Sequence, residues 1–313
     1  MRALVVTPSS PATLAISEVA APTVAPDQAL VTVRAAAVNR GERTRLASAA
    51  EGTIFGWDVA GVIADPAALA PTFDRGARVV GMALAGGGWA EQVGLRECDL
   101  AEIPSRISFE AATTLPVAGL TAYRALKFHS NLLGAQVLIT GASGAVGWFA
   151  VQLATLAGAE VSVLVRDESS ASELQNLGAA HVIAGEAELA GPKRFDFVLD
   201  AVGGDVTSQV LRTMRSAAEV VVVGNLAAST GLLTPGAIVV AGVSVRGYRL
   251  AVDAITRPLG DDLAKLLAWA VSGKLRLPEI AAFAWDAAEE VNLALAGGFA
   301  AVKPVLTISQ ASR

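Results

Sequence analysis

Residues 137–147 read VLITGASGAVG, and this stretch decides how the chain folds. An apolar run, VLIT, meets three glycines, and the apolar helical pattern WFAVQLATLAG follows at once. A second apolar run, VSVLV, ends at Val165. A strand, a glycine-rich turn, a helix and a second strand in this order are typical of a nucleotide-binding βαβ unit. We therefore predict a turn that holds a pyrophosphate, and the alternative is a tight corner that binds nothing.

The three glycines of this turn have different predicted tasks. Gly141 permits a tight turn, Gly144 lets the backbone approach a pyrophosphate, and Gly147 lets the helix pack close to the strand. The free N–H groups and the positive dipole end of the helix then face the phosphates. The spacing departs from the common GxGxxG pattern because residue 143 is Ser. The predicted phosphate-binding residues are Gly141, Ser143, Gly144, Ala145, Val146 and Gly147.

The chain outside this turn reads as three pieces. The first, about 1–117, has short β-type runs between turn signals, which predicts an antiparallel or barrel-like domain. The second, about 118–250, alternates strand and helix patterns, which predicts an α/β fold with a doubly wound parallel sheet. The third, about 251–313, has two helical patterns and a final strand, AVKPVLTI, which we expect to pair with the first piece.

These patterns predict individual elements as well. The predicted strands of the middle piece are 137–140, 161–165, 181–183, 196–200, 220–224 and 238–245, and its predicted helices include 145–157 and 170–178. Runs this apolar suit parallel strands that are covered on both faces. The helical patterns of the last piece stop at Gly273 and cover 287–298.

Composition limits the compartment and the partners. The 313 residues are 53% apolar and 17% charged, with a net charge of −5, and their basic residues are scattered. This argues against nucleic acid or an anionic membrane as the main partner. The longest apolar runs are too short to span a bilayer. One cysteine, Cys98, cannot form an internal disulfide, which fits a reducing cytoplasm. We expect a cytoplasmic protein whose partner is a small-molecule substrate.

The end of the second βαβ strand bears on the choice of dinucleotide. An NAD site usually has Asp or Glu there, but this strand ends at Val165 and Arg166 follows. A guanidinium can pair with the 2′-phosphate of NADP in a bidentate manner, and Ser169 can add a hydroxyl donor. We predict NADP, although Asp167 or Glu168 could neutralise Arg166. The alternative for Arg166 is an ordinary solvated loop arginine.

Further cofactor contacts are expected where parallel strands end, because their carboxyl ends face the ligand crevice. Two strand ends should border the adenosine or the ribose, and the end of the run 238–245 should lie near the nicotinamide. The residues at these ends are Ala201 and Val202, Gly224 and Asn225, and Ser244 and Arg246. We expect Tyr248 to approach the substrate, where it could supply a proton.

Several motifs in order resemble one known family over nearly the whole chain. They are AAAVNRGE (35–42), FGWDVAGVI (55–63), GARVVGM (76–82), GGGWAEQV (86–93), LPVAGLTAYRAL (115–126), VLITGASGAVG (137–147), DFVLDAVGG (196–204) and VKPVL (302–306). The chain resembles the medium-chain dehydrogenase/reductase superfamily, in its zinc-independent quinone oxidoreductase and enoyl reductase branch. The resemblance implies a GroES-like catalytic domain formed by 1–117 and 251–313, with a Rossmann NADP-binding domain inserted at 118–250.

The resemblance also implies that no metal is bound. Zinc-dependent relatives carry Cys and His ligands at the places that Asn39 and Trp57 occupy here. The only histidines, His129 and His181, lie elsewhere, and we expect both to be structural or solvated. Three nitrogen or sulfur ligands for a catalytic zinc are therefore not expected.

For activity, the resemblance implies hydride transfer from NADPH to a conjugated acceptor such as a quinone, an enone or an enoyl compound. Asn39 matches an Asn that lies near the substrate carbonyl in this branch, and it could instead only hold a strand end. Thr44, Trp57 and Tyr248 are the other candidate catalytic residues, and we expect Thr121 near the nicotinamide, although it could simply cap a helix. We expect Arg43 and Arg45 to face solvent rather than an acidic substrate.

Two other functions remain open, and the resemblance also implies an oligomer. The chain could be a carbonyl or alcohol dehydrogenase that works without zinc, or a non-catalytic, crystallin-like nucleotide-binding protein. Homodimers are common in this branch, often through edge strands, and the run at 238–245 is the candidate edge.

Overall fold

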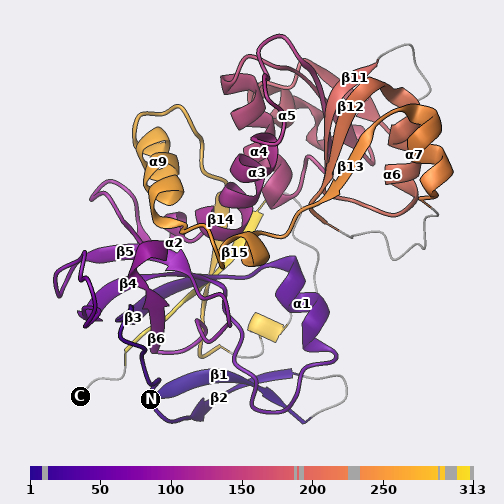
Figure 1. The fold of residues 1–313 in the computed structure, drawn as a ribbon. Coiled ribbons are helices and arrows are strands. Elements are labelled where there is room, and N and C mark those ends of the chain that lie inside the picture. The colour runs from indigo at the N-terminus through magenta and orange to yellow at the C-terminus, as the bar shows by residue number, and fades with distance from the viewer. Residues whose placement is uncertain are drawn as a thin grey trace. The chain divides into compact units, whose positions relative to one another are not determined.

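The computed structural model describes residues 1–8, 13–186, 189, 194–224, 233–287, 290–292 and 302–310. The chain divides into two units (Figure 1). The β-rich unit comprises Met1–Val117, Asp253–Gly273 and Leu277–Arg313, and the parallel-sheet unit comprises Ala118–Val252 and Lys274–Arg276. Among the described residues, no helix is long and apolar enough to cross a membrane.

The parallel-sheet unit is built on one sheet of six parallel strands. Its strands are β8 (Gln136–Thr140), β9 (Glu160–Val165), β10 (His181–Ala184), β11 (Phe195–Asp200), β12 (Met214–Val222) and β13 (Ser244–Gly247), and the order across the sheet is β10-β9-β8-β11-β12-β13. The strand order reverses between β8 and β11, and ligands of such folds bind at this point. The predicted doubly wound α/β fold is confirmed.

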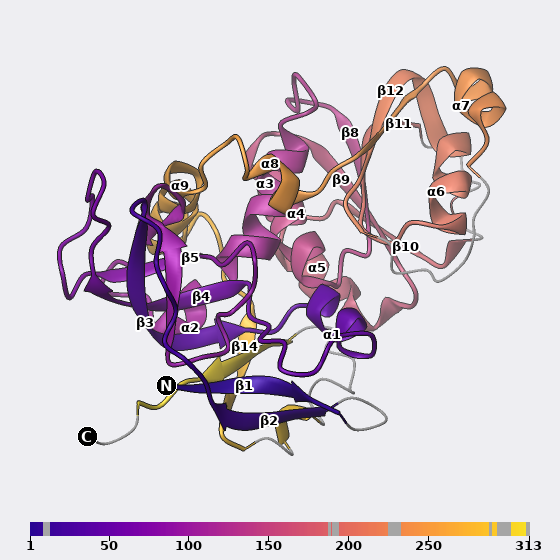
Figure 2. The ribbon, with the colours of Figure 1, turned by 60° about the horizontal axis from the view of Figure 1, so that its bottom comes forward.

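Helices cover both faces of this sheet (Figures 1 and 2). They are α3 (Leu120–Leu126), α4 (Ala145–Leu156), α5 (Ala171–Asn176), α6 (Asp205–Val210) and α7 (Pro235–Ala241), and a short helix, α8 (Leu250–Asp253), follows β13. In Figures 1 and 2, α3, α4 and α5 lie on one face and α6 and α7 on the other. The central strands are therefore closed off from solvent, and Val137, Leu138 and Ile139 are fully buried, as their apolar run predicts.

The predicted strand at 238–245 was wrong in its first half. Residues up to Ala241 form helix α7, and only Ser244–Gly247 form strand β13. Thr234 caps the helix by accepting from the Ala237 N–H at 3.2 Å, Pro235 follows at the first helical position, and Gly242 ends the helix at φ +63°. These start and stop signals outweigh the strand preference of the Ile-Val-Val run.

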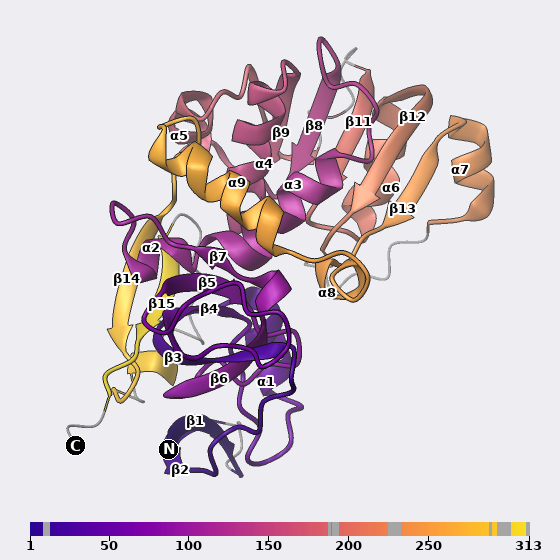
Figure 3. The ribbon, with the colours of Figure 1, turned by 60° about the vertical axis from the view of Figure 1, so that its left-hand side comes forward.

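The β-rich unit has its own hydrophobic core, and Figure 3 shows the strands that form this unit. Its strands are β1 (Arg2–Thr7), β2 (Thr13–Glu18), β3 (Gln28–Ala37), β4 (Asp58–Asp65), β5 (Arg78–Met82), β6 (Gln92–Arg96), β7 (Ala101–Glu102), β14 (Glu279–Ala284) and β15 (Val302–Thr307). Its helices are α1 (Arg40–Leu46), α2 (Phe109–Ala112) and α9 (Gly260–Val271). Strands β1 and β2 form a hairpin, and the larger sheet has the order β14-β15-β3-β4-β5-β7, with β6 also pairing with β3.

The last strand of the chain joins the first part of the sequence. Strand β15 pairs antiparallel with β3 and parallel with β14, so the predicted return of the final strand to the first piece is confirmed. The predicted helix that stops at Gly273 is α9. The predicted helix at 287–298 lies mostly outside the described residues.

Candidate functional site

The glycine turn after β8 has the geometry of a phosphate-binding loop. Gly141 has φ +61°, and Gly144 is the N-cap of α4. A Cβ atom on Gly147 would lie 2.4 Å from the Ala142 Cα, so the first turn of α4 packs directly onto the loop. The N–H groups of that first turn have no partner within the helix. The half-buried residues Gly141, Ser143, Gly144, Ala145 and Val146 thus form a cradle that suits an anion.

The neighbouring strand end is held by Asp200. Its buried carboxylate accepts from the Val202 N–H at 2.9 Å and from the Gly203 N–H at 3.0 Å. It also accepts from the hydroxyls of Thr140 and Thr207, so this acidic residue fixes the loop between β11 and α6. Ala201 is buried and Val202 is half-buried in that loop. Gly224, after β12, lies directly against the Ala201 backbone, whereas Asn225 lies outside the described residues.

The end of β9 presents Arg166 to solvent. The strand ends at Val165, as predicted, and Arg166 is exposed. The Asp167 carboxylate accepts from the Ser169 N–H at 2.9 Å. Hydrogen bonds from Ser169, and secondarily the Arg166 charge, hold the pKa of Asp167 below its usual value. Among the residues described, no carboxylate forms an ion pair with Arg166, so Asp167 serves the loop rather than neutralising the arginine.

Strand β13 lies differently from its prediction. Ser244 is the first residue of the strand, which ends at Gly247, so the placement of Ser244 at a carboxyl end was wrong. The Arg246 guanidinium lies 4.5 Å from the Phe128 ring centroid, and the buried Tyr248 ring meets Phe128 edge-on at 5.5 Å. Arg246 and Tyr248 therefore both pack against the Phe128 ring.

Thr121 lies inside a helix rather than at its cap. Helix α3 begins at Leu120 and continues a π-helical turn, Leu115–Gly119, and Gly119 already has helical φ and ψ. The capping alternative for Thr121 was wrong, and its buried side chain is an internal helical residue.

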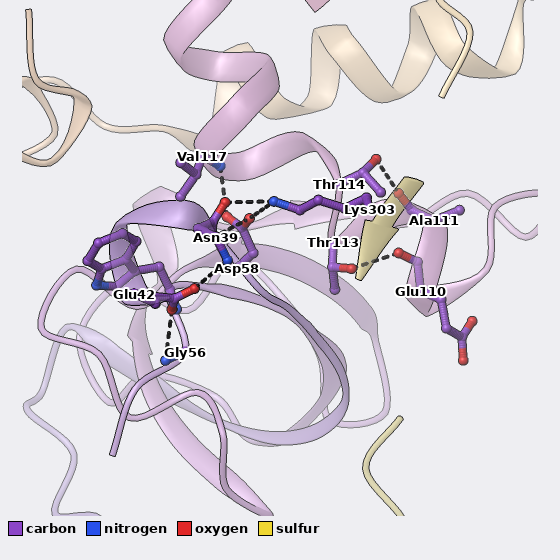
Figure 4. A network of polar contacts seen from close by, with 11 residues as sticks. Asn39, Glu42, Gly56, Asp58, Glu110, Ala111, Thr113, Thr114, Val117 and Lys303 are labelled. Atoms are coloured by element: carbon purple, nitrogen blue, oxygen red, sulfur yellow. Dashed lines mark hydrogen bonds and ion pairs between the residues drawn. The ribbon is translucent and has the colours of Figure 1, made fainter. Parts of the chain in front are cut away.

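The β-rich unit contains a buried polar cluster of Asn39, Glu42, Asp58 and Lys303, which we call the Asn39 network (Figure 4). The Asn39 Nδ2 donates to Asp58 Oδ2 at 2.9 Å, and Lys303 Nζ donates to Asn39 Oδ1 at 2.6 Å. The Lys303 Nζ lies 3.6 Å from Asp58 Oδ2. Asn39 is the N-cap of α1, Asp58 opens β4 and Lys303 lies on β15, so three distant segments meet here.

Glu42 anchors the backbone around Asn39. Its carboxylate accepts from the Asn39 N–H at 2.7 Å, the Gly56 N–H at 2.9 Å and the Trp57 N–H at 2.7 Å. Burial raises the pKa of Glu42 to about 7, against the lowering effect of these N–H donors, and the Asp58 charge adds to the rise. Burial also raises the pKa of Asp58, while the Lys303 ammonium opposes the rise. The cluster therefore holds two acids and one cation away from water.

The other predicted catalytic residues of the β-rich unit lie closer to its surface. Thr44 is exposed on α1, and its hydroxyl donates to the Gly41 carbonyl at 3.1 Å. Trp57 is half-buried, and the exposed Arg45 guanidinium lies 5.0 Å from its ring centroid. Asn39 is thus the one of these three that the structure places in a buried polar cluster.

Asp58 and Lys303 are polar residues that the sequence reasoning missed. Both lie within motifs that carry the resemblance, FGWDVAGVI and VKPVL, but neither was predicted to have a role. The available signal was a single charge within an otherwise apolar motif, because such a charge is rarely buried unless it is paired.

The histidines are engaged with carboxylates. His129 Nδ1 lies 3.2 Å from Glu219 Oε2, and His181 Nε2 lies 2.9 Å from Glu160 Oε1. No group of three or more His, Cys, Asp or Glu side chains that could hold a metal ion occurs within the described part of the chain. Zinc independence stays a prediction that rests on Asn39 and Trp57 at the expected ligand places.

Known proteins resemble this chain in sequence and in fold. The family described as zinc-binding dehydrogenase matches residues 145–269. The quinone oxidoreductase-like protein 2 homolog of Nematostella vectensis is 30% identical over 239 residues, 72% of this chain and 65% of that protein. The 2-methylene-furan-3-one reductase of Solanum lycopersicum is 30% identical over 277 residues, 83% of this chain and 66% of that protein. Each match spans less than two thirds of the relative's own length.

The solved structure of the quinone oxidoreductase of Pseudomonas syringae has the same fold. It is 23% identical, covers 98% of this chain and all of that one, and superposes with a TM-score of 0.85. The chain belongs to the medium-chain dehydrogenase/reductase superfamily. The resemblance inferred from its motifs, to the quinone oxidoreductase-like branch of that superfamily, is confirmed. The word zinc in the family description does not decide about zinc here, because residues 145–269 contain no cysteine and His181 as their single histidine.

Proposed function

We propose that the protein is an oxidoreductase that reduces conjugated acceptors, such as quinones, enones or enoyl compounds, with NADPH and without zinc. One observation carries this proposal: the place of a zinc ligand is taken by Asn39, whose carboxamide is fixed in a buried polar cluster. Such a site offers a hydrogen-bond donor rather than a Lewis acid. A conjugated carbonyl needs no more, because its oxygen becomes negative only as the β-carbon is reduced.

The residues of the parallel-sheet unit fit a dinucleotide. The glycines of the loop 141–147 let the start of α4 pack directly onto the loop, and the loop lies at the point where the strand order reverses. Bound NADPH supplies a hydride. The loop N–H groups bind the pyrophosphate, and the ends of β11 and β12 at Ala201, Val202 and Gly224 border the adenosine or the ribose. Asn39 donates an N–H to the acceptor oxygen, and solvent or Tyr248 supplies the proton for the α-carbon.

The preference for NADPH is supported by Arg166. This guanidinium is exposed directly after β9, and the strand ends without a carboxylate that would bind ribose hydroxyls or repel a phosphate. Asp167 is occupied by Ser169, so it leaves the guanidinium available for a 2′-phosphate.

A panel of acceptors tests the proposed activity. NADPH absorbance is followed with quinones, enones, simple ketones and alcohols, and NADPH binding is measured separately by calorimetry. We expect oxidation of NADPH with conjugated acceptors only. Turnover of simple ketones would favour a carbonyl dehydrogenase, and NADPH binding without any turnover would favour a crystallin-like protein.

A further inference from the structure

The ammonium of Lys303 lies closer to an amide oxygen than to a carboxylate. Its buried ammonium lies 2.6 Å from Asn39 Oδ1 but 3.6 Å from Asp58 Oδ2. An ion pair that only balanced charge would place Nζ closest to the acid, because attraction grows as the separation falls. The Asn39 carboxamide contacts both charged groups, and Lys303 lies closer to its oxygen than to the carboxylate with which it forms an ion pair (Figure 4).

The chemistry of these neighbours fixes which way the amide faces. Lysine only donates hydrogen bonds, so Oδ1 must face Lys303. The ionised Asp58 carboxylate only accepts hydrogen bonds, and its Oδ1 already accepts from the Val117 N–H at 2.8 Å, so the amide group that contacts Oδ2 must be the donor Nδ2. A flipped amide would place its NH₂ against the ammonium and its oxygen against the carboxylate.

This arrangement leaves one N–H of Asn39 for another partner. A carboxamide has two N–H donors, and Asp58 takes one of them. Within the described residues, no second acceptor contacts Nδ2. Lys303 also withdraws electron density through Oδ1, which strengthens the remaining N–H as a donor.

We propose that Lys303 and Asp58 are positioning residues that fix the Asn39 carboxamide so that its second N–H binds the carbonyl oxygen of the acceptor. The inference rests on the proposed function, because it assigns that N–H to the reacting molecule. The negative charge on the oxygen develops only during reduction. Fixing the Asn39 carboxamide should therefore affect kcat more than NADPH affinity.

Substitutions of Lys303 and Asp58 test whether these residues fix the Asn39 carboxamide. Lys303→Met removes the ammonium at similar length, and it leaves two buried acids without their cation, which destabilises the protein. The double variant Lys303→Met with Asp58→Asn removes the charge pair together, so it relieves that imbalance. Lys274→Met, at an exposed lysine, is the matched control. Thermal unfolding, calorimetric NADPH affinity and kcat are measured for each variant.

We expect the double variant to regain thermal stability relative to Lys303→Met while its kcat stays about 10- to 100-fold below that of the wild type. This is less than the roughly 100- to 1,000-fold loss typical of a removed oxyanion donor, because the carboxamide is misaligned rather than absent. Its NADPH affinity should change less than about threefold, because the glycine loop at 141–147 and the Asn39 network belong to different units and share no partner residue among those described. If stability and kcat recover together, Lys303 only balances charge and the proposal is wrong.

A spectroscopic measurement separates this proposal from the proposed reaction. The side-chain amide signals of Asn39 are identified by their loss in Asn39→Asp and followed in ¹⁵N-labelled protein. We expect distinct, slowly exchanging N–H signals in the wild type that shift in the double variant but not in Lys274→Met. Signals at the same positions in the double variant and the wild type would show that Lys303 and Asp58 do not fix the carboxamide, and would overturn the proposal. A wild type that oxidises no NADPH with any acceptor would instead overturn the proposed function. The amide signals would still show whether Lys303 and Asp58 fix the Asn39 carboxamide.

Discussion

Single residues in the Asn39 network have to serve two opposing needs. Glu42 must bind three backbone N–H groups, which favours its ionised form, yet it is fully buried, which disfavours that form. Burial prevails, so the pKa of Glu42 is raised to about 7. Its proton uptake is therefore coupled to folding.

This coupling predicts a pH dependence of stability. Because the folded pKa of about 7 exceeds the ordinary 4.5, the folded protein retains a proton that the unfolded chain releases between these pH values. The free energy of unfolding should fall as pH rises from 4.5 to 7, by up to about 3 kcal/mol from this group. Urea unfolding at several pH values should show a shallower slope in Glu42→Gln, and the exposed Glu279→Gln is the control. Equal slopes in all three proteins would contradict the expectation.

Arg166 is a second residue whose environment makes a prediction. Arg166→Ala should weaken NADPH binding about 10- to 100-fold, which corresponds to the loss of one charged hydrogen-bonding partner, and should leave NADH affinity nearly unchanged. Calorimetry with both nucleotides measures the ratio. Arg212→Ala, at another exposed arginine of the parallel-sheet unit, should not alter it. An unchanged ratio in Arg166→Ala would remove the basis for preferring NADPH.

At the scale of elements, the close contact between the glycine loop and α4 is the feature that makes a phosphate cradle. Gly147→Ala would place a Cβ atom 2.4 Å from the Ala142 Cα and 2.6 Å from two carbonyl oxygens, so α4 has to move. We expect lower stability and at least about tenfold weaker NADPH binding, because a displaced helix start no longer aims its N–H groups. Gly236→Ala in α7 meets nothing closer than 4.0 Å and is the control. Full NADPH affinity in Gly147→Ala would show that the loop does not bind the pyrophosphate.

Elements were predictable from the sequence where a local pattern agreed with its surroundings. The strand and helix around residue 141 could be placed because an apolar run, a glycine turn and a helical pattern follow one another. The run at 238–245 misled because Ile, Val and Val favour strands, while the decisive signals, Thr234, Pro235 and Gly242, lie at its borders. The Asn39 network could not be predicted from spacing, since Lys303 reaches Asn39 through tertiary pairing of β15 with β3.

At the scale of the whole molecule, we propose a homodimer that forms through β13 and α7. Strand β13 is the last strand in the order of its sheet, and Val239 and Val240 on α7 are 78% and 89% exposed. A sheet edge beside exposed valines is a surface that a second copy can cover.

A charge on α7 tests this dimer. Val240→Glu should shift the sedimentation coefficient from dimer to monomer, because a carboxylate in an apolar interface has to be desolvated without a partner. Leu133→Glu, at a residue that is 75% exposed before β8, should leave the sedimentation coefficient unchanged. A monomeric wild type at micromolar concentration would refute the proposal.

The long separation in sequence between Lys303 and its partners has a consequence for biosynthesis. During translation, Asn39, Glu42 and Asp58 leave the ribosome some 240 residues before the cation that neutralises their cluster, as their numbers in the sequence show. A nascent β-rich unit therefore carries uncompensated acids and lacks strand β15 until synthesis has passed residue 307. Ribosome-bound chains halted before this strand should remain open to proteases, because the β-rich unit cannot complete its sheet until β15 has left the ribosome.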